Sequence, residues 1–193
     1  MNTIELKPAC KDYLWGGEKL RENYGIDSPL HPLAEAWMLS CHPDGPSVVA
    51  SGPHAGKTFP AYIEAVGRSC LGSDCEAFSD FPILIKLIDA KGDLSIQVHP
   101  SDDYALAHEH QLGKTEAWYV MDCDEGATLY YGFRHQIGKD ELARRAKDGT
   151  LTEVLNAAPE GGSWYLARRI TEGTEGKPAL ERGDRLWAQL TAP

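Results

Sequence analysis

The chain has 193 residues, 42% of them hydrophobic, and a formal net charge of −10, which is typical of a globular protein of one domain or slightly more. It has no apolar run near the ~18 residues of a membrane span and no secretory signal at its N-terminus. From these two features we expect a cytoplasmic protein that does not bind a membrane. The acidic charge disfavours nucleic acid as a partner, because phosphate binding needs a clustered basic face.

Short apolar runs bounded by Gly, Pro, Asp and Ser predict strands in the first two thirds of the chain. Tight connections are predicted between them by the segments HPDG, KGD and DCDEG. In chain order, the predicted strands are EAWMLS (35–40), PSVVAS (46–51), ILIKLID (83–89), LSIQVH (94–99), EAWYVM (116–121) and ATLYYG (127–132).

Three segments predict helices instead. Thr58 can cap a helix that ends before Gly67, and Ser101 can start one that runs to about His110. The clearest is KDELARRAKDG (139–149), which has an apolar stripe among charges and a glycine just past its end. Many strands with a few peripheral helices favour a mainly β protein, a β-barrel or jelly roll, over a doubly wound sheet.

From about Pro159 onward the sequence has no sustained period of either kind, and we expect loop, weak structure or an atypical end there. The five cysteines are odd in number, scattered and without a CxxC pair. This spacing argues against a disulfide framework and against a cysteine-only zinc site. We therefore expect reduced, partly buried thiols.

The run LSIQVH holds the first residues that could carry chemistry. In a strand, its alternation places Ser95, Gln97 and His99 on one face. The same parity places Lys114, Glu116 and Trp118 on one face of a second strand. If both faces line one barrel interior, oxygens of Gln97 and Glu116 and a nitrogen of His99 could converge on a divalent ion. A half-exposed strand without a metal gives the same pattern, so the alternation leaves both interpretations open.

Two charged residues lie within apolar runs. Lys86 is in the middle of ILIKLID, and Glu35 lies in AEAWML. An ammonium group in such a run needs a carboxylate, a metal-site neighbour or an anionic ligand, unless it is an edge-strand lysine that reaches water. Together the two residues would make an interior that holds charged groups.

Several strings closely resemble one family. FPILIKLIDAKGDLSIQVHPSDDYA (81–105) and GKTEAWYV (113–120), preceded in order by LWGG (14–17) and AEAWMLSCHPDGPSVV (34–49), resemble the type I mannose-6-phosphate isomerases, in particular their short bacterial form. These are zinc-dependent cupin-fold enzymes. The resemblance covers about residues 1–156 and implies a cupin-like jelly roll, incomplete at the C-terminus. It divides the chain into a catalytic region, 1–156, and a divergent tail, 157–193.

In that family, zinc is held by a Gln, a His, a Glu and a later His. The resemblance places the first three at Gln97, His99 and Glu116. It implies that Lys114 is catalytic, polarising a substrate oxygen or relaying a proton. It also places four residues along the sugar-phosphate pocket: Trp15, Glu35, Lys86 and Ser95.

No histidine follows His135, so the sequence offers no fourth ligand. A divergent natural C-terminus, a fragment and a shifted reading frame all remain open as reasons. Zinc held by three protein ligands would bind more weakly and with a less fixed geometry, so we expect low or absent turnover.

The resemblance implies an isomerase that interconverts mannose 6-phosphate and fructose 6-phosphate. A Lewis-acidic zinc ion and nearby ammonium groups would stabilise the negative charge of an enediol-like intermediate. The alternative is a non-catalytic cupin that binds a sugar phosphate or a metal. A cupin oxygenase is disfavoured because such sites usually offer two or three histidines. The sequence leaves the oligomeric state open.

Overall fold

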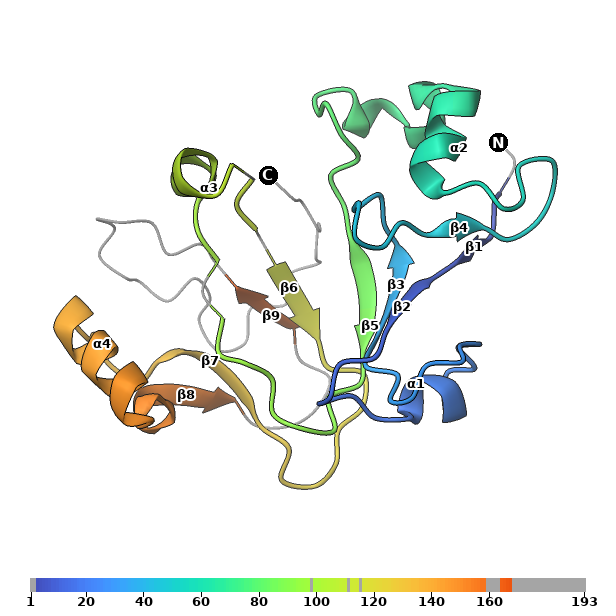
Figure 1. Ribbon diagram of the computed structural model, residues 1–193. Helices are drawn as coiled ribbons and strands as arrows, with labels where there is room; N and C mark the ends of the chain where they lie inside the picture. Colours follow the sequence, from blue (N-terminus) through green and yellow to red (C-terminus); the bar gives the residue numbers. More distant parts are fainter. Residues whose placement is uncertain (1–2, 98, 111, 115, 159–163, 168–193) are drawn as a thin grey trace. The chain divides into compact units, whose positions relative to one another are not determined.

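The computed structural model describes residues 3–97, 99–110, 112–114, 116–158 and 164–167. They form a mainly β protein with a few helices, as expected, and the chain divides into two compact units (Figure 1). The first, unit 1, is Met1–Ser95, and the second, unit 2, is Ile96–Pro193. None of the helices among the described residues has the length and apolar character of a membrane span.

Unit 1 is built on a three-stranded antiparallel sheet of β2 (Ala9–Lys11), β3 (Glu35–Leu39) and β5 (Ile85–Ile88), with β3 in the centre. Cys10 lies opposite Ala36, and Ala36 lies opposite Leu87 on the other strand. Directly opposed residues share a face of a sheet. This face packs on the hydrophobic core, whose members include Leu20, Ile26, Leu30, Leu33 and Met38.

The other face of this sheet carries the charged side chains that interrupt the apolar runs. Glu35 lies opposite Lys11, and Trp37 lies opposite Lys86. Because successive strand residues point to opposite faces, all four side chains project away from the apolar core. The sequence pattern therefore produces a sheet with one apolar face, which packs on the core, and one face that can hold charged side chains.

Two short elements complete the strands of unit 1. β1 (Leu6–Lys7) pairs with β4 (Val48–Val49), and α2 (Phe59–Val66) lies beside β4 (Figure 1). Thr58 caps α2 by accepting a hydrogen bond from the Ala61 amide at 3.4 Å, as the sequence predicts. The remaining helices are α1 (Lys19–Glu22), η1 (Arg68–Leu71) and η2 (Ser73–Cys75).

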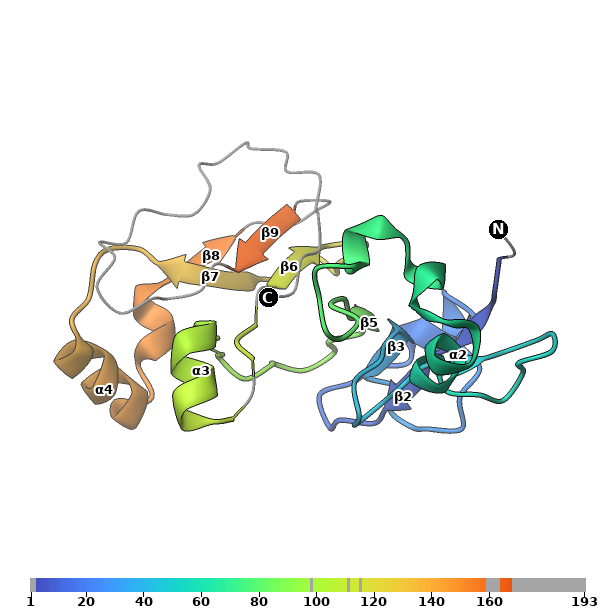
Figure 2. The same ribbon diagram turned by 90° about the horizontal axis from the view of Figure 1, so that it is seen from above.

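Unit 2 contains two antiparallel strand pairs. β6 (Glu116–Tyr119) pairs with β9 (Trp164–Ala167), and β7 (Leu129–Phe133) pairs with β8 (Leu155–Ala158). In Figure 2 the helices α3 and α4 of this unit lie on the same side of these strands. The buried apolar side chains in its described part are Ala105, Val154 and Leu155.

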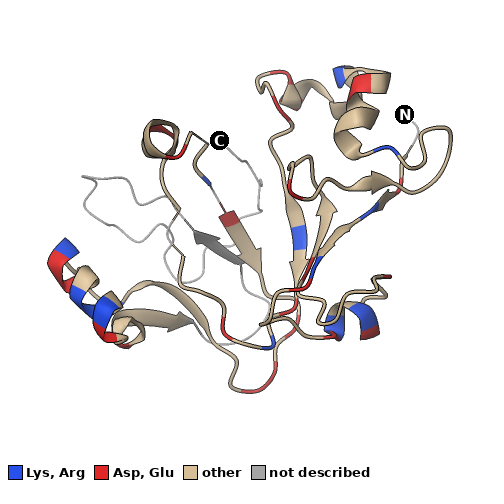
Figure 3. Ribbon diagram, viewed as in Figure 1, with Lys and Arg blue, Asp and Glu red and all other residues tan. Residues whose placement is uncertain are grey.

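The helices of unit 2 begin and end where the sequence predicts. α3 (Asp102–His108) has Ser101 as its N-cap, which accepts from the Tyr104 amide at 3.4 Å. α4 (Lys139–Asp148) ends at Gly149 in the left-handed conformation, with φ 71°, and is followed by η3 (Leu151–Val154). Figure 3 shows charged residues gathered along α4, whereas most strand positions are uncharged.

Five of the six predicted strands are present, but the strand predicted at 94–99 is wrong. The described residues of this run, 94–97 and 99, are not in a strand, and Ile96 is 47% exposed although the alternation predicts it buried. Alternation is a property of the sequence, whereas a strand also needs a hydrogen-bonded neighbour. Within the described part of the chain, no strand pairs with this run.

The tail also differs from the expectation. Residues 159–163 and 168–193 lie outside the described part, but Trp164–Ala167 is a strand, not a loop. Its four residues, WYLA, are too few for a period to be detected, although aromatic residues favour strands. The boundary predicted at residue 156 stays a prediction.

Candidate functional site

Three predicted site residues meet in unit 2. Nε2 of His99 lies 2.7 Å from Oε2 of Glu116, and Nζ of Lys114 lies 2.9 Å from Oε1 of the same carboxylate. The His99 and Glu116 side chains are 18% and 14% exposed, while that of Lys114 is 43% exposed. A nitrogen donor and a carboxylate therefore lie side by side, with an ammonium group that remains accessible to a ligand.

The start of α3 brings these residues together. The Asp102 carboxylate accepts a hydrogen bond from the Gly113 amide at 2.8 Å. Gly113 lies so close to this segment that a Cβ atom on it would be 2.5 Å from the Pro100 carbonyl oxygen. The contact holds the segment around Gly113 against the residues that follow His99, and Glu116 further along this segment contacts the imidazole.

The sequence did not reveal this role of Asp102, which the pattern marks only as a residue of the first helical turn. As the first residue of α3, directly after the N-cap Ser101, it gives no hint of a contact with residue 113. The sequence signal that could have pointed to this contact is Gly113 in the GK string, because an isolated glycine can mark a place where another backbone approaches closely.

Glu116 is held in its charged form. Burial raises the pKa of this carboxyl, but the hydrogen bond and charge of Lys114 lower it, as do hydrogen bonds from His99 and Trp118. Together the lowering contacts outweigh burial, so the pKa lies below its ordinary value of 4.5. At neutral pH, Glu116 is therefore a carboxylate, the form that binds a divalent cation.

Gln97 and Ser95 lie before His99 in a run outside any helix or strand, and both are exposed. The face that Ser95, Gln97 and His99 were predicted to share rests on a strand that is not formed. Among the described residues, no group of three or more His, Cys, Asp and Glu side chains could hold a metal ion. A ligand role for Gln97 thus stays a prediction, beside a histidine–glutamate pair that is in contact.

A second group of predicted residues lies in unit 1. Glu35 is 5% exposed, and its two carboxylate oxygens accept from Nζ of Lys86 at 3.0 Å and from Nε1 of Trp37 at 2.7 Å. Of the two interpretations of Lys86, the structure favours the paired lysine over an edge lysine that reaches water, because its side chain is only 21% exposed.

The turn with the sequence YLWGG lies beside this pair. The rings of Tyr13 and Trp15 stack with centroids 5.5 Å apart. Burial raises the pKa of Tyr13, and the charge of Glu35 raises it further, followed by those of Asp44 and Asp12. The aromatic pair is therefore an electrostatic neighbour of the Glu35 carboxylate.

Sequence reasoning missed three members of this group, which are Tyr13, Trp37 and Lys11. Nζ of Lys11 lies 4.7 Å from the centroid of the Trp37 ring, a cation–π contact. The parity of β3 could have found Trp37, because it lies two residues after Glu35. The predicted site residues thus form two groups, Trp15, Glu35, Lys86 and Ser95 in unit 1 and Gln97, His99, Lys114 and Glu116 in unit 2.

A comparison with protein families decides which kind of protein this is. The family model described as phosphomannose isomerase type I, catalytic domain, matches residues 3–126. The chain belongs to this family. The resemblance drawn from four strings of the sequence is confirmed.

Curated proteins of the phosphomannose isomerase family match most of the chain. The probable mannose-6-phosphate isomerase GmuF of Bacillus subtilis is 44% identical over 154 residues, which is 78% of this chain and 47% of that protein. The mannose-6-phosphate isomerase of Streptococcus mutans is 41% identical over 165 residues, 85% of this chain and 51% of the relative. The chain spans about half the length of the curated relatives it matches.

A solved structure supports the fold. The mannose 6-phosphate isomerase of Bacillus subtilis matches with a TM-score of 0.79 at 38% sequence identity, covering 88% of this chain and 53% of that one. The mainly β, cupin-like fold of phosphomannose isomerases is confirmed.

Proposed function

We propose that the chain carries the site of a mannose-6-phosphate isomerase, an aldose–ketose isomerase that interconverts mannose 6-phosphate and fructose 6-phosphate. The observation that carries this proposal is the contact of His99 and Lys114 with one Glu116 carboxylate in a member of this family. Relatives at about 40% identity that bear this name support the substrate class.

Zinc is the cofactor that we assign to this site. An imidazole nitrogen and a carboxylate oxygen are ligands that Zn²⁺ prefers, and Glu116 is already charged when it meets His99. His99 and Glu116 would hold the ion, with Gln97 as the third protein ligand. When bound, zinc supplies a Lewis acid for the oxygens of the substrate.

Lys114 is the residue that we assign to the reacting atoms. Moving a proton between C1 and C2 of a sugar phosphate creates negative charge on the two adjacent oxygens. An ammonium group held by Glu116, yet 43% exposed, can donate to such an oxygen or relay a proton at Nζ.

The unit 1 group is assigned to the sugar phosphate. Lys86 would bind the phosphate with the N–H groups that Glu35 leaves available, since an ammonium carries three donors. Trp15 offers an aromatic surface and Ser95 an exposed hydroxyl. Glu35, with both oxygens in use, would act by holding Lys86 in place.

Turnover by this chain is expected to be low, because no histidine follows His135 to supply a fourth ligand. The same observation favours a second candidate, a cupin that binds a sugar phosphate or a metal without turnover.

We also propose a cytoplasmic location, since all five cysteines are free thiols, as is usual in a reducing compartment.

Elemental analysis and a coupled assay for fructose 6-phosphate test these assignments together. The wild-type chain is compared with the double variant Gln97→Ala, His99→Ala and with His108→Ala, which removes an exposed imidazole on α3 that stacks on Tyr104. Zinc and turnover that are both lost only in the double variant would support the isomerase. Zinc without turnover would support the binding protein, and a zinc-free wild-type protein would contradict the assigned cofactor.

A further inference from the structure

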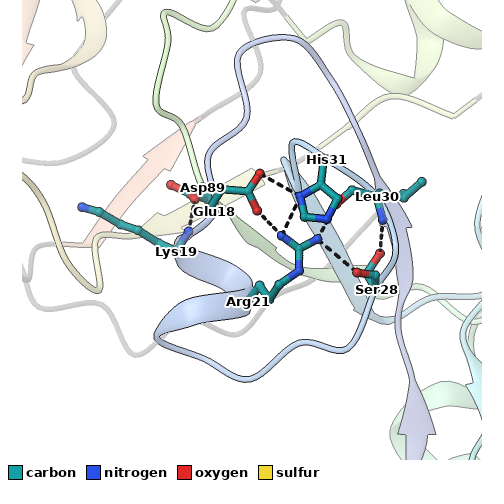
Figure 4. A network of polar contacts seen from close by, with 7 residues as sticks. All are labelled: Glu18, Lys19, Arg21, Ser28, Leu30, His31 and Asp89. Atoms are coloured by element: carbon teal, nitrogen blue, oxygen red, sulfur yellow. Dashed lines mark hydrogen bonds and ion pairs between the residues drawn. The ribbon is translucent and has the colours of Figure 1, made fainter.

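Asp89 connects two parts of the unit 1 group. It follows β5 directly, three residues after Lys86, and is only 8% exposed. Its Oδ2 accepts a hydrogen bond from the Lys19 backbone amide at 2.7 Å (Figure 4). Its carbonyl oxygen accepts from the Gly17 amide at 3.2 Å. The strand that carries Lys86 is thus bonded to the residues that follow Trp15.

The carboxylate of Asp89 lies where a cap of α1 would lie. Glu18 stands at the N-cap position of this helix but gives no side-chain cap, although the first amides of a helix need an acceptor. Asp89 supplies that acceptor from a distant strand. Burying a carboxylate is costly unless it is hydrogen-bonded, so the bond from the Lys19 amide offsets the cost of burying Asp89 here.

A second network holds α1 from its other side. Figure 4 shows the Arg21 guanidinium among four partners. It donates to the Glu18 carboxylate and to the carbonyl oxygens of Ser28, at 3.0 Å, and of Leu30, and it lies 3.2 Å from Nδ1 of His31. Asp89 therefore holds the start of this short helix, and Arg21 ties the helix to Glu18 and to the segment 28–31.

The turn before α1 is packed against the same strand end without free space. A Cβ atom on Gly17 would lie 2.4 Å from Oδ2 of Asp89, and one on Gly16 would lie 2.6 Å from the Cα atom of Ala34. The Trp15 carbonyl oxygen accepts from the Gly92 amide at 2.8 Å. The backbone that follows the Trp15 Cα atom is therefore hydrogen-bonded to Asp89 and Gly92, just after β5.

We propose that Asp89 is a positioning residue, which fixes the turn that carries Trp15 against the strand that carries Lys86. Trp15 and Lys86 then meet a sugar phosphate in a set arrangement, which a loose turn would not provide. This inference rests on the proposed role of the unit 1 group in sugar-phosphate binding.

The test measures the dissociation constants of fructose 6-phosphate and of inorganic phosphate for Asp89→Ala and Asp89→Asn, each in the wild-type and in a Trp15→Ala background. The side-chain carbonyl oxygen of Asn can still accept a hydrogen bond from the Lys19 backbone amide. We expect Asp89→Ala to weaken fructose 6-phosphate binding about tenfold, Asp89→Asn to retain it, and inorganic phosphate binding to stay unchanged. In the Trp15→Ala background, Asp89→Ala should have no further effect. Asp93→Ala, which removes an exposed carboxylate nearby, is the control.

Equal losses in both backgrounds, or an equal loss for inorganic phosphate, would overturn the proposal, because a general loss of structure acts in this way. A second readout does not need a sugar. In protein labelled with 5-fluorotryptophan, the ¹⁹F signal assigned to Trp15 should shift in Asp89→Ala and remain in place in Asp89→Asn. If wild type binds no sugar phosphate, the proposed function fails, and this signal alone decides the positioning role. A Trp15 signal that stays unmoved in Asp89→Ala contradicts that role.

Discussion

Glu35 and Glu116 are held in the same way in the two units. Each is the first residue of a strand with the sequence Glu-Ala-Trp, each is bound by a lysine ammonium, and each accepts a hydrogen bond from the tryptophan two residues later. Burying a carboxylate is costly unless such donors form hydrogen bonds with it. The sequence pointed to Glu35 and Lys86 because charges within apolar runs stand out, and to Glu116 and Lys114 through strand parity and the family resemblance. It placed Trp118 on the face of Glu116 but predicted neither tryptophan's hydrogen bond to its glutamate, since an aromatic residue in a strand is ordinary.

Acid should destabilise the fold through Glu116. Its pKa is lowered in the folded chain, so its contacts contribute stability above its ordinary pKa of 4.5. That contribution is lost as the pH falls through the folded value. We expect the free energy of unfolding, measured with urea at several pH values, to fall less steeply with acid in Glu116→Gln than in wild type. Glu125→Gln, at an exposed position, should keep the wild-type slope. Equal slopes for wild type and Glu116→Gln would contradict the assigned contacts.

Lys114→Met should make zinc binding more sensitive to acid. Without the ammonium group, burial raises the pKa of Glu116 with less opposition, so protons compete with the metal at a higher pH. Any turnover should fall by about 10²–10⁴-fold, the usual contribution of a positioned acid or base. Zinc content measured across a pH series checks the first effect, with the exposed Lys147→Met on α4 as the control. A zinc–pH curve that does not move would show that Lys114 leaves Glu116 unaffected.

At the scale of elements, the sequence predicts best where a local signal decides. Thr58, Ser101 and Gly149 mark helix ends, and each does so in the structure. The run 94–99 shows the limit, because its alternation is correct for a strand but its hydrogen-bonding neighbour is decided elsewhere in the chain. Contacts such as Asp102 with Gly113 could not be predicted, since they join a helix start to a backbone amide without a shared motif.

Gly17→Ala should destabilise unit 1 by about 1–3 kcal/mol, because the added methyl group would overlap the Asp89 carboxylate. In an Asp89→Ala background, the same substitution should cost clearly less, since the obstructing atoms are gone. The free energy of unfolding in urea measures both. Gly92→Ala is the matched control, as its Cβ atom would meet Trp15 at an ordinary 3.4 Å. Equal costs in both backgrounds would mean that another contact limits position 17.

At the scale of the whole molecule, the family was predictable from the sequence, whereas the division into two compact units was not. The strings around Gln97 and Glu116 are long and ordered enough to identify the family. The same strings cannot reveal the compact units Met1–Ser95 and Ile96–Pro193, whose boundary falls inside the longest matching string. Unit boundaries follow from the distribution of contacts across the folded chain, which no local pattern contains.

The bend at Lys91, a junction segment of unit 1 close to its end at Ser95, should be the first site of trypsin cleavage among the described residues. Lys91 is exposed and lies in a bend outside any helix or strand. Limited trypsin digestion followed by mass spectrometry should therefore show a cut after Lys91 before cuts within α1 or α4, which both contain Lys and Arg. Lys91→Gln should remove this product and leave the others. Early cleavage within those helices, with the 91–92 bond intact, would show that the junction is protected.

The contact between Gly17 and Asp89 also constrains how this sequence can change over time. A larger residue at position 17 is tolerated only after residue 89 has become smaller. A smaller residue at 89 removes the acceptor for the first amide of α1. Every route of single substitutions through this pair therefore passes through a less stable protein. The two positions are expected to vary together in descendants of this chain, or not at all.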